Sequence, residues 1–176
     1  MADRASFDEF YLGTREGVLR QLTAMTTDPD LAGDVVQEAY TRAWQRWARV
    51  SGLDDPAAWV RTVAWRIAVS HFRRASVARR RLVRLGHDAE TRPQHESDTR
   101  LDIEAALRRL TPEHRRVLVL HEMVGLTVLQ IAEEIGVAEG TVKSRLFRAR
   151  AHLVAALGPD YPAAVDEPPV SGEVGR

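Results

Sequence analysis

The alternation of apolar and polar positions over residues 126–153 predicts two short helices joined by a sharp turn. Thr127 can cap the first helix, and Gln130, three positions later, completes a capping box. Gly136 is expected to end this helix, because a left-handed residue is least costly as glycine. A second helix then runs over about residues 139–153, and its apolar positions share one face because they are spaced by four, three and four residues. These positions are Val142, Leu146, Ala149 and Leu153.

The opposite face of the second helix is basic, and it also carries a hydroxyl and an aromatic ring. No acidic residue occurs from position 140 to position 159. A basic amphipathic helix by itself usually indicates only a solvated surface. Here it follows a glycine-terminated partner helix, and this pairing is the signature of a helix-turn-helix, whose second helix enters the major groove of DNA. The pattern therefore favours DNA recognition by Lys143, Ser144, Phe147 and Arg148.

Three more amphipathic helices are predicted in the N-terminal half, over residues 6–26, 31–47 and 56–74. A proline between two aspartates separates the first two helices, and residues 49–55 form a loop before the third. Asp55 can cap the third helix, whose first position is a proline, where the missing backbone donor costs nothing. The apolar side of the third helix is expected to carry Val60, Val63, Ala64, Ile67 and His71.

The third helix also begins a second basic block, since no acid occurs between positions 56 and 87. On a chain whose formal net charge is zero, two basic blocks suggest two separate contacts with a polyanion. Trp59 and Trp65 interleave with the arginines, and bases of single-stranded nucleic acid could stack on such rings. Ordinary core positions would give the same spacing, so the pattern leaves both interpretations open. The arginines of this block are Arg61, Arg66, Arg73, Arg74, Arg79, Arg80, Arg81 and Arg84.

The apolar periodicity stops after residue 85 and resumes near residue 101, which predicts a flexible linker between two domains. Thr111 followed by proline and glutamate is a strong helix start in the second domain. The proline- and glycine-rich tail is expected to be disordered. The predicted fold is therefore all-α, with a small helical domain over residues 1–75, a flexible linker over residues 76–98, a helix-turn-helix domain over residues 99–158 and a tail over residues 159–176.

Composition narrows the function classes. The 176-residue chain has no cysteine, which excludes disulfides and thiolate metal sites and fits a reducing cytoplasm. No apolar run approaches the roughly 18 residues of a membrane span, and the first residues lack the apolar core of a signal peptide. His114 and His121 have no third ligand in step, so no metal and no cofactor are expected. No phosphate-binding glycine loop or Ser-His-Asp arrangement stands out, so no enzymatic activity is expected.

The two halves together resemble a bacterial RNA polymerase sigma factor of the sigma-70 class. The closest type is the extracytoplasmic-function (ECF) group, which keeps only the second and fourth conserved regions. The resemblance covers residues 6–158. Its most specific matches are DVVQEAY at residues 34–40 and GTVKSRLFRAR at residues 140–150, and Trp59-Val60 with Arg73-Arg74 is a weaker third match. It implies a region 2-like domain and a region 4-like helix-turn-helix domain.

The resemblance implies roles for three groups of residues. Asp34, Gln37 and Glu38 match the segment that docks on core RNA polymerase. The third helix matches the part that opens promoter DNA and reads the −10 element, and the loop before it matches the region that captures a flipped base. The −10 residues so implied are Trp59, Arg66, His71, Arg73 and Arg74. The implied −35 residues are Thr141, Lys143, Ser144, Arg145, Phe147 and Arg148, of which Arg145 lies to the side and is expected to reach phosphate.

The chain departs from the family pattern at several positions. Arg66 stands where an asparagine is frequent and Ser70 where an aspartate is frequent, so the family's −10 preference does not transfer directly. Ala138 replaces the usual serine or proline before the recognition helix, which predicts a weak cap. Leu129 stands where many members have glutamate, and it either alters a contact or adds packing.

The function implied is that of a sigma factor, which binds core RNA polymerase, directs it to a promoter through the −35 and −10 elements and stabilises melted DNA. Its partners are then core polymerase and promoter DNA, and many members of the group also have an anti-sigma factor. The alternative is a free-standing helix-turn-helix regulator, which needs dimer symmetry and a palindromic site. No dimerising helix is evident after residue 153.

Overall fold

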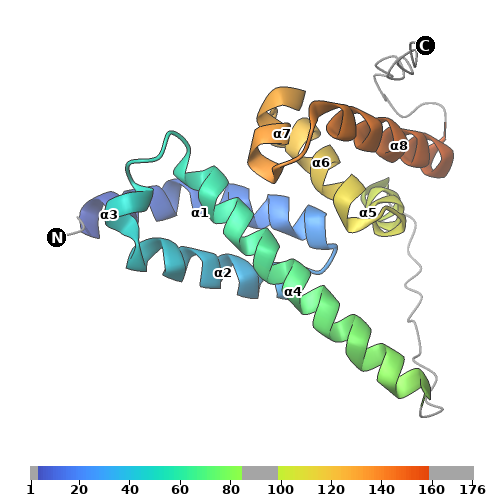
Figure 1. Cartoon of the computed structure of the whole chain (residues 1–176), viewed down its shortest axis with the longest axis horizontal. Coiled ribbons are helices and arrows are strands. Elements are labelled where there is room, and N and C mark those ends of the chain that lie inside the picture. The colour runs from blue at the N-terminus through green and yellow to red at the C-terminus, as the bar shows by residue number, and fades with distance from the viewer. Residues whose placement is uncertain (1–3, 85–98, 159–176) are drawn as a thin grey trace, which may run out of the picture. The chain divides into compact units, whose positions relative to one another are not determined.

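The computed structural model describes residues 4–84 and 99–158. Over these residues the chain forms eight α-helices and no β-strand (Figure 1). It divides into two compact units, Met1–Ser97 and Asp98–Arg176, and each unit has four of these helices and buried apolar residues of its own. The all-α fold predicted from the sequence is confirmed.

The first unit is built from α1 (Arg4–Thr26), α2 (Pro29–Gln45) and α4 (Pro56–Arg84), with the single turn α3 (Trp47–Val50) between the last two. Each of the three long helices packs against the other two. Burying an aliphatic side chain contributes about 1.5–3 kcal/mol, so this shared interior is the main source of stability. The interior residues include Val18, Leu22, Met25, Val35, Val36, Ala39, Val60, Ala64 and Ala68.

The starts of α2 and α4 follow the aspartate–proline signals in the sequence. Asp28 accepts a hydrogen bond from the Leu31 N–H at 3.0 Å, which caps α2. Asp55 accepts one from the Ala58 N–H at 2.9 Å at the start of α4. An aspartate in this position satisfies a helix N–H that has no intrahelical partner and contributes about 1 kcal/mol. The signal lies within one helical turn, which is why the sequence was sufficient to place it.

Aromatic rings gather where α1 meets α2 and α3. The Phe10 ring lies 5.0 Å from that of Trp47, and the Tyr11 ring lies 5.0 Å from that of Tyr40, centroid to centroid. The Tyr40 hydroxyl is 2.7 Å from that of Thr14, so its polar end is satisfied inside the cluster. Burial raises the pKa of Tyr40, and the hydrogen bond with Thr14 opposes that shift. The cluster consists of Phe7, Phe10, Tyr11, Tyr40, Trp44 and Trp47.

Helix α4 is longer than predicted. The sequence pattern placed its end near Arg74, but the helix continues to Arg84, so residues 76–84 of the predicted linker are helical. The apolar stripe ends before this segment, but the residues of the segment still favour helix. Six of the ten residues 75–84 are alanine or arginine, which favour helix, and none is glycine or proline. The rest of the predicted linker, residues 85–98, and the predicted tail, residues 159–176, lie outside the described residues.

Two smaller differences concern α3 and α4. His71 was expected on the apolar side of α4, but it is exposed, because the buried face ends at Ala68 among the positions whose exposure is described. The predicted loop 49–55 begins later than expected, because Val50 is only 1% exposed and belongs to α3. The α3–α4 loop therefore consists of residues 51–55.

Gly13 lies inside α1 and is exposed. A Cβ atom added there would meet nothing within 4 Å, and alanine is about 1 kcal/mol more favourable than glycine inside a helix. Gly13→Ala is expected to raise the free energy of unfolding of the first unit by about 0.5–1 kcal/mol. Urea unfolding followed by circular dichroism measures this change. Gly125→Ala should lower stability instead, because φ at Gly125 is +79°. A loss of stability in Gly13→Ala would contradict the prediction.

The second unit consists of α5 (Thr99–Arg109), α6 (Pro112–Glu122), α7 (Val128–Ile135) and α8 (Glu139–Leu157), and α8 packs against each of the other three. The helix-turn-helix pair predicted from the sequence is α7 and α8. Helix α8 extends past the predicted end at Leu153 to Leu157. One cluster of the interior contains Ala106, Leu110, Leu118, Ala149 and Leu153.

Candidate functional surfaces

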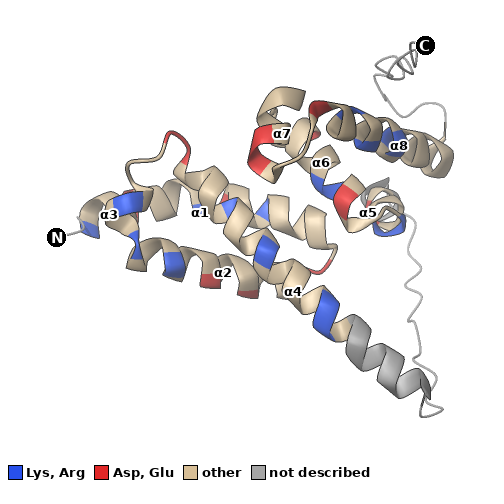
Figure 2. Cartoon of the chain, viewed as in Figure 1, with Lys and Arg blue, Asp and Glu red and all other residues tan. Residues whose placement is uncertain are grey.

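The rotation of α8 about its axis is fixed by its buried stripe, in which Val142 and Ala149 are each 0% exposed. Lysine and arginine recur along α8 (Figure 2), and Lys143 and Arg148 among them are exposed. The Ser144 hydroxyl donates a hydrogen bond to the Thr141 carbonyl oxygen at 3.0 Å, so it is directed along its own helix. Of the predicted −35 residues, Lys143, Phe147 and Arg148 are exposed, and Thr141, Ser144 and Arg145 are half-buried.

Arg150 is a cation of α8 that does not belong to this exposed face. It is 8% exposed, and its Nε and one terminal nitrogen donate to Glu122 Oε1 at 3.2 and 2.9 Å. The pair joins α8 to the end of α6. From the sequence, Arg150 counted with Lys143, Arg145 and Arg148 as one basic run, because the position of its acidic partner is not a local signal.

His114 shows that the first turn of α6 lies in the electrostatic field of the basic face of α8. Burial lowers the pKa of His114, and the positive charges of Arg148, His152 and Arg145 lower it further, while Glu113 opposes them. Its neutral form is therefore favoured more than that of an ordinary histidine. The charge of Arg148 has the largest effect among these charges, so the pKa of His114 reports on the position of the Arg148 side chain.

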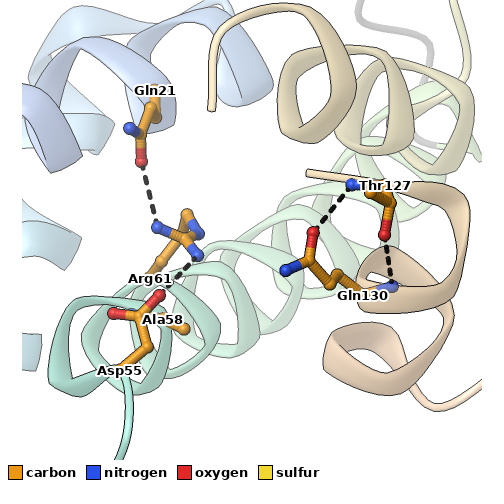
Figure 3. Close-up of polar contacts among 6 residues, drawn as sticks. All are labelled: Gln21, Asp55, Ala58, Arg61, Thr127 and Gln130. Atoms are coloured by element: carbon orange, nitrogen blue, oxygen red, sulfur yellow. Dashed lines mark hydrogen bonds and ion pairs between the residues drawn. The ribbon is translucent and has the colours of Figure 1, made fainter. Parts of the chain in front are cut away.

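The turn between α7 and α8 is built from local capping. Thr127 Oγ1 accepts a hydrogen bond from the Gln130 N–H at 3.3 Å, and Gln130 Oε1 accepts one from the Thr127 N–H at 2.9 Å, which completes the capping box (Figure 3). Gly136 ends α7 with φ at +71°, where a side chain would be strained. Ala138 precedes α8 without a side-chain hydrogen bond, so the predicted weak cap is confirmed.

Thr127→Ala removes the acceptor for one N–H of α7 and breaks the reciprocal pair with Gln130. We expect the free energy of unfolding of the second unit to fall by about 1 kcal/mol. Thr127→Ser, which keeps the hydroxyl, should stay close to the parent chain. Thermal unfolding of the three chains measures the difference. If Thr127→Ala unfolds at the same temperature as Thr127→Ser, the capping box does not contribute to stability.

Leu129 does not add packing, which was one of the two interpretations of its departure from the family pattern. It is 54% exposed on the first turn of α7, and Met123, just after α6, is 50% exposed. A leucine at this position leaves apolar surface in water, where glutamate would be solvated. The other interpretation, an altered contact, stays a prediction.

Helix α4 presents most of the predicted −10 residues at its surface. Arg66, His71, Arg73 and Arg74 are exposed, and Trp59 is half-buried. Trp65 is 6% exposed, so it is a core residue, and the alternative of base stacking is wrong for this position. Arg61 is 3% exposed and therefore does not belong to the solvent-facing basic block in which the sequence placed it. The side chains of residues 76–84 lie outside the described positions.

Helix α2 presents an acidic and amide surface on the side opposite to its core residues. Asp34, Gln37 and Glu38 are exposed together with Thr41, and these residues line a shallow depression. Glu38 forms an ion pair with Arg42 one turn later. The intervening apolar residues Val35, Val36 and Ala39 face the core of the unit. The three predicted polymerase-docking residues therefore lie together on the exposed face of α2.

Among the described residues, no group of three or more histidines, aspartates or glutamates is arranged to hold a metal ion. None of the helices in the described segments has the length and apolar character needed to cross a bilayer.

Comparison with known families matches both units. Residues 11–78 match the family described as Sigma-70 region 2, and residues 100–153 match the one described as Sigma-70, region 4. The two matched segments fall in the first and second units respectively. They include the exposed face of α2 and most of the exposed face of α8.

Individual relatives agree with these matches. The chain is 37% identical over 150 residues to the ECF RNA polymerase sigma factor SigL of Mycobacterium tuberculosis (strain ATCC 25618 / H37Rv), covering 81% of each chain. It is 34% identical over 137 residues to the probable ECF RNA polymerase sigma factor SigI of the same strain, covering 72% of this chain and 47% of SigI. Among solved structures, the sigma factor RpoE in complex with the anti-sigma factor NepR from Bartonella quintana matches with a TM-score of 0.74 and 25% identity, covering 88% of this chain and 98% of RpoE.

Proposed function

Because this chain belongs to the ECF RNA polymerase sigma factors, we propose that its two units make separate contacts with a promoter and that the first unit also binds core RNA polymerase. The chain is a promoter-directing sigma factor. The observation that carries the division of roles is the surface placement of the family-matched segments. The first unit buries the apolar side of α2 and the second unit that of α8, and in both helices the polar side is exposed.

In the second unit, α8 is the recognition helix for the −35 element. Lys143 and Arg148 are exposed beside the half-buried Ser144, and the major groove of DNA admits an α-helix that presents such side chains to base edges. Arg148 is assigned to a base edge, because arginine pairs bidentately with guanine. Arg145, which is half-buried at the side of the face, is assigned to phosphate.

In the first unit, the exposed arginines of α4 hold the backbone at the −10 element, and the α3–α4 loop captures a flipped base. Arg66, Arg73 and Arg74 supply the positive charge, and the half-buried Trp59 is assigned to stacking on a base. The exposed face of α2 is assigned to core polymerase. Its residues are Asp34, Gln37 and Glu38.

The chain itself is proposed to carry no catalysis, since the polymerase performs the chemistry. Its site of action is then the bacterial cytoplasm, where the polymerase works. An anti-sigma factor is a further proposed partner, because the related RpoE was solved with one. The boundaries proposed for the two domains are those predicted above, with the first extended through α4.

Transcription in vitro from a pool of genomic fragments tests this function. Purified core polymerase is assayed with and without the chain, and the 5′ ends of the transcripts are mapped. New transcripts whose starts share upstream sequences at two fixed spacings are expected. The free-standing regulator would instead bind DNA tightly without polymerase and create no new starts, and that combination of results would overturn the proposal.

A further inference from the structure

A buried arginine lies one turn inside α4, directly behind the α3–α4 loop. Arg61 is 3% exposed, although Arg66, Arg73 and Arg74 of the same basic run are exposed. One terminal nitrogen lies 3.8 Å from Asp55 Oδ2, and the other donates to Gln21 Oε1 at 3.5 Å (Figure 3). The guanidinium therefore connects the last residue of the loop to α1, whose Gln21 lies forty positions before Arg61.

Burying this guanidinium has a cost that simple packing would not require. Removing a charge from water is unfavourable, and replacement of a buried ion pair by apolar residues of similar volume is often neutral or stabilising. A methionine could fill much of the same space between α1 and α4. Stability alone therefore does not explain the arginine. Its planar guanidinium can contact Asp55 and Gln21 at the same time, which an apolar side chain cannot do.

Asp55 is held at both carboxylate oxygens. Oδ1 accepts from the Ala58 N–H at 2.9 Å, and Oδ2 faces Arg61. At the other end of the loop, the Leu53 N–H donates to the carbonyl oxygen of the buried Val50 at 3.1 Å. The loop is thus fixed at its start by α3 and at its end by Asp55. Arg61 is what ties the second of these points to α1.

We propose that Arg61 is a positioning residue for −10 recognition: together with Asp55 and Gln21 it sets the geometry of the α3–α4 loop, and thereby the selectivity for the base that the loop captures. This inference rests on the proposed function, in which that loop holds a flipped base. Arg61 itself is buried and makes no contact with DNA. Its effect on base choice is indirect, through the loop.

Asp55→Asn is the sharpest test, because asparagine caps a helix about as well as aspartate but loses the charge that faces Arg61. Asp28→Asn is its matched control, since Asp28 caps α2 through the same kind of bond in the same unit and no ion pair is described for it. The readout is −10 selectivity, defined as the ratio of transcription from a cognate promoter to that from promoters with each single substitution in the −10 element. Asp55→Asn is expected to lower this ratio about fivefold, and Asp28→Asn to leave it unchanged.

Arg61→Met and Gln21→Leu test the two residues that act with Asp55 in the proposal. Both should lower −10 selectivity while core binding, measured by pull-down, and dependence on the −35 element stay at the parent level. Combining Arg61→Met with Asp55→Asn should give less than the product of the two single effects, because both remove the same contact. Circular dichroism establishes that each variant retains its helix content. If Arg61→Met does not fold, Asp55→Asn and Gln21→Leu still decide the matter.

The outcomes are distinguishable. Folded variants whose −10 selectivity equals that of the parent and of Asp28→Asn would overturn the positioning role while leaving the sigma function intact. An equal loss of transcription from every promoter, without a change of ratio, would assign Arg61 to stability only and would also overturn it. A parent chain that gives core polymerase no new starts would overturn the proposed function itself, and with it the inference.

Discussion

Replacing Arg148 with alanine is expected to reduce transcription from a −35-dependent promoter by a factor of about 5 to 150, which corresponds to about 1–3 kcal/mol. Arg148 is exposed on the side of α8 opposite to the buried Val142 and Ala149, so its truncation removes no core contact. The loss should be greatest at one position of the −35 element, because a base contact carries sequence information and a phosphate contact does not. Promoter variants with single substitutions identify that position.

Arg148→Lys separates the two kinds of contact. Lysine keeps the charge but cannot reproduce a bidentate pair with guanine, so this variant should lose −35 selectivity almost as fully as alanine does. A phosphate contact would instead be largely restored by lysine. Arg109→Ala, which removes an exposed arginine from α5, is the control for a general loss of charge. Unchanged promoter use by Arg148→Ala would contradict the assignment.

His114 provides an internal check on the position of the Arg148 side chain. Because the Arg148 charge is among the causes that lower the pKa of His114, Arg148→Ala should raise that pKa toward the ordinary histidine value. Burial still lowers it in the variant, so the return should be incomplete. Histidine resonances followed by NMR over a pH titration measure the change. A rise in the pKa without loss of fold supports the position of the Arg148 side chain beside His114, and an unchanged pKa would contradict it.

The double substitution Gln37→Ala with Glu38→Ala is expected to weaken binding to core polymerase by about 2 kcal/mol, roughly 30-fold. Both side chains are exposed on α2, whose opposite side is buried, so their removal acts on the surface and not on the core. An interface concentrates its binding energy in a few residues, and these two are half of the four residues that line the depression on α2. Pull-down of core polymerase at several protein concentrations measures the loss.

Glu16→Ala is the matched control for this substitution. Glu16 pairs with Arg20 at 3.7 Å on α1, four positions later, as Glu38 pairs with Arg42 on α2. Removal of either glutamate therefore breaks an exposed ion pair between adjacent turns of one helix. Exposed pairs of this kind contribute about 0–1 kcal/mol, and the control should bind core polymerase normally. Binding of α8 to −35 DNA should be intact in both variants. Normal core binding by the double variant would remove the docking assignment.

The capping signals of the helix-turn-helix could be recognised from the sequence because every one of them acts within a single turn. Thr127 and Gln130, three positions apart, form reciprocal hydrogen bonds. Gly136 adopts a positive φ without strain because glycine has no Cβ atom. The apolar stripe of α8 is equally local, since its period alone defines a face. By contrast, the extension of α4 to Arg84 was missed, because the stripe and the helix do not end at the same residue.

The sequence by itself determined the all-α character, most helix starts and the two faces that the family resemblance assigns to polymerase and DNA, whereas the single-turn helix α3 was not predicted. The tertiary structure alone decided which arginines are free to meet DNA. Arg61 and Arg66 lie in one basic run, as do Arg148 and Arg150, yet in each pair one side chain is exposed and the other is buried. The buried ones face Gln21 and Glu122, forty and 28 positions away. For Arg61 and Arg150, partners from a distant segment offset the lost hydration of the guanidinium, and only the packed fold brings such partners within reach.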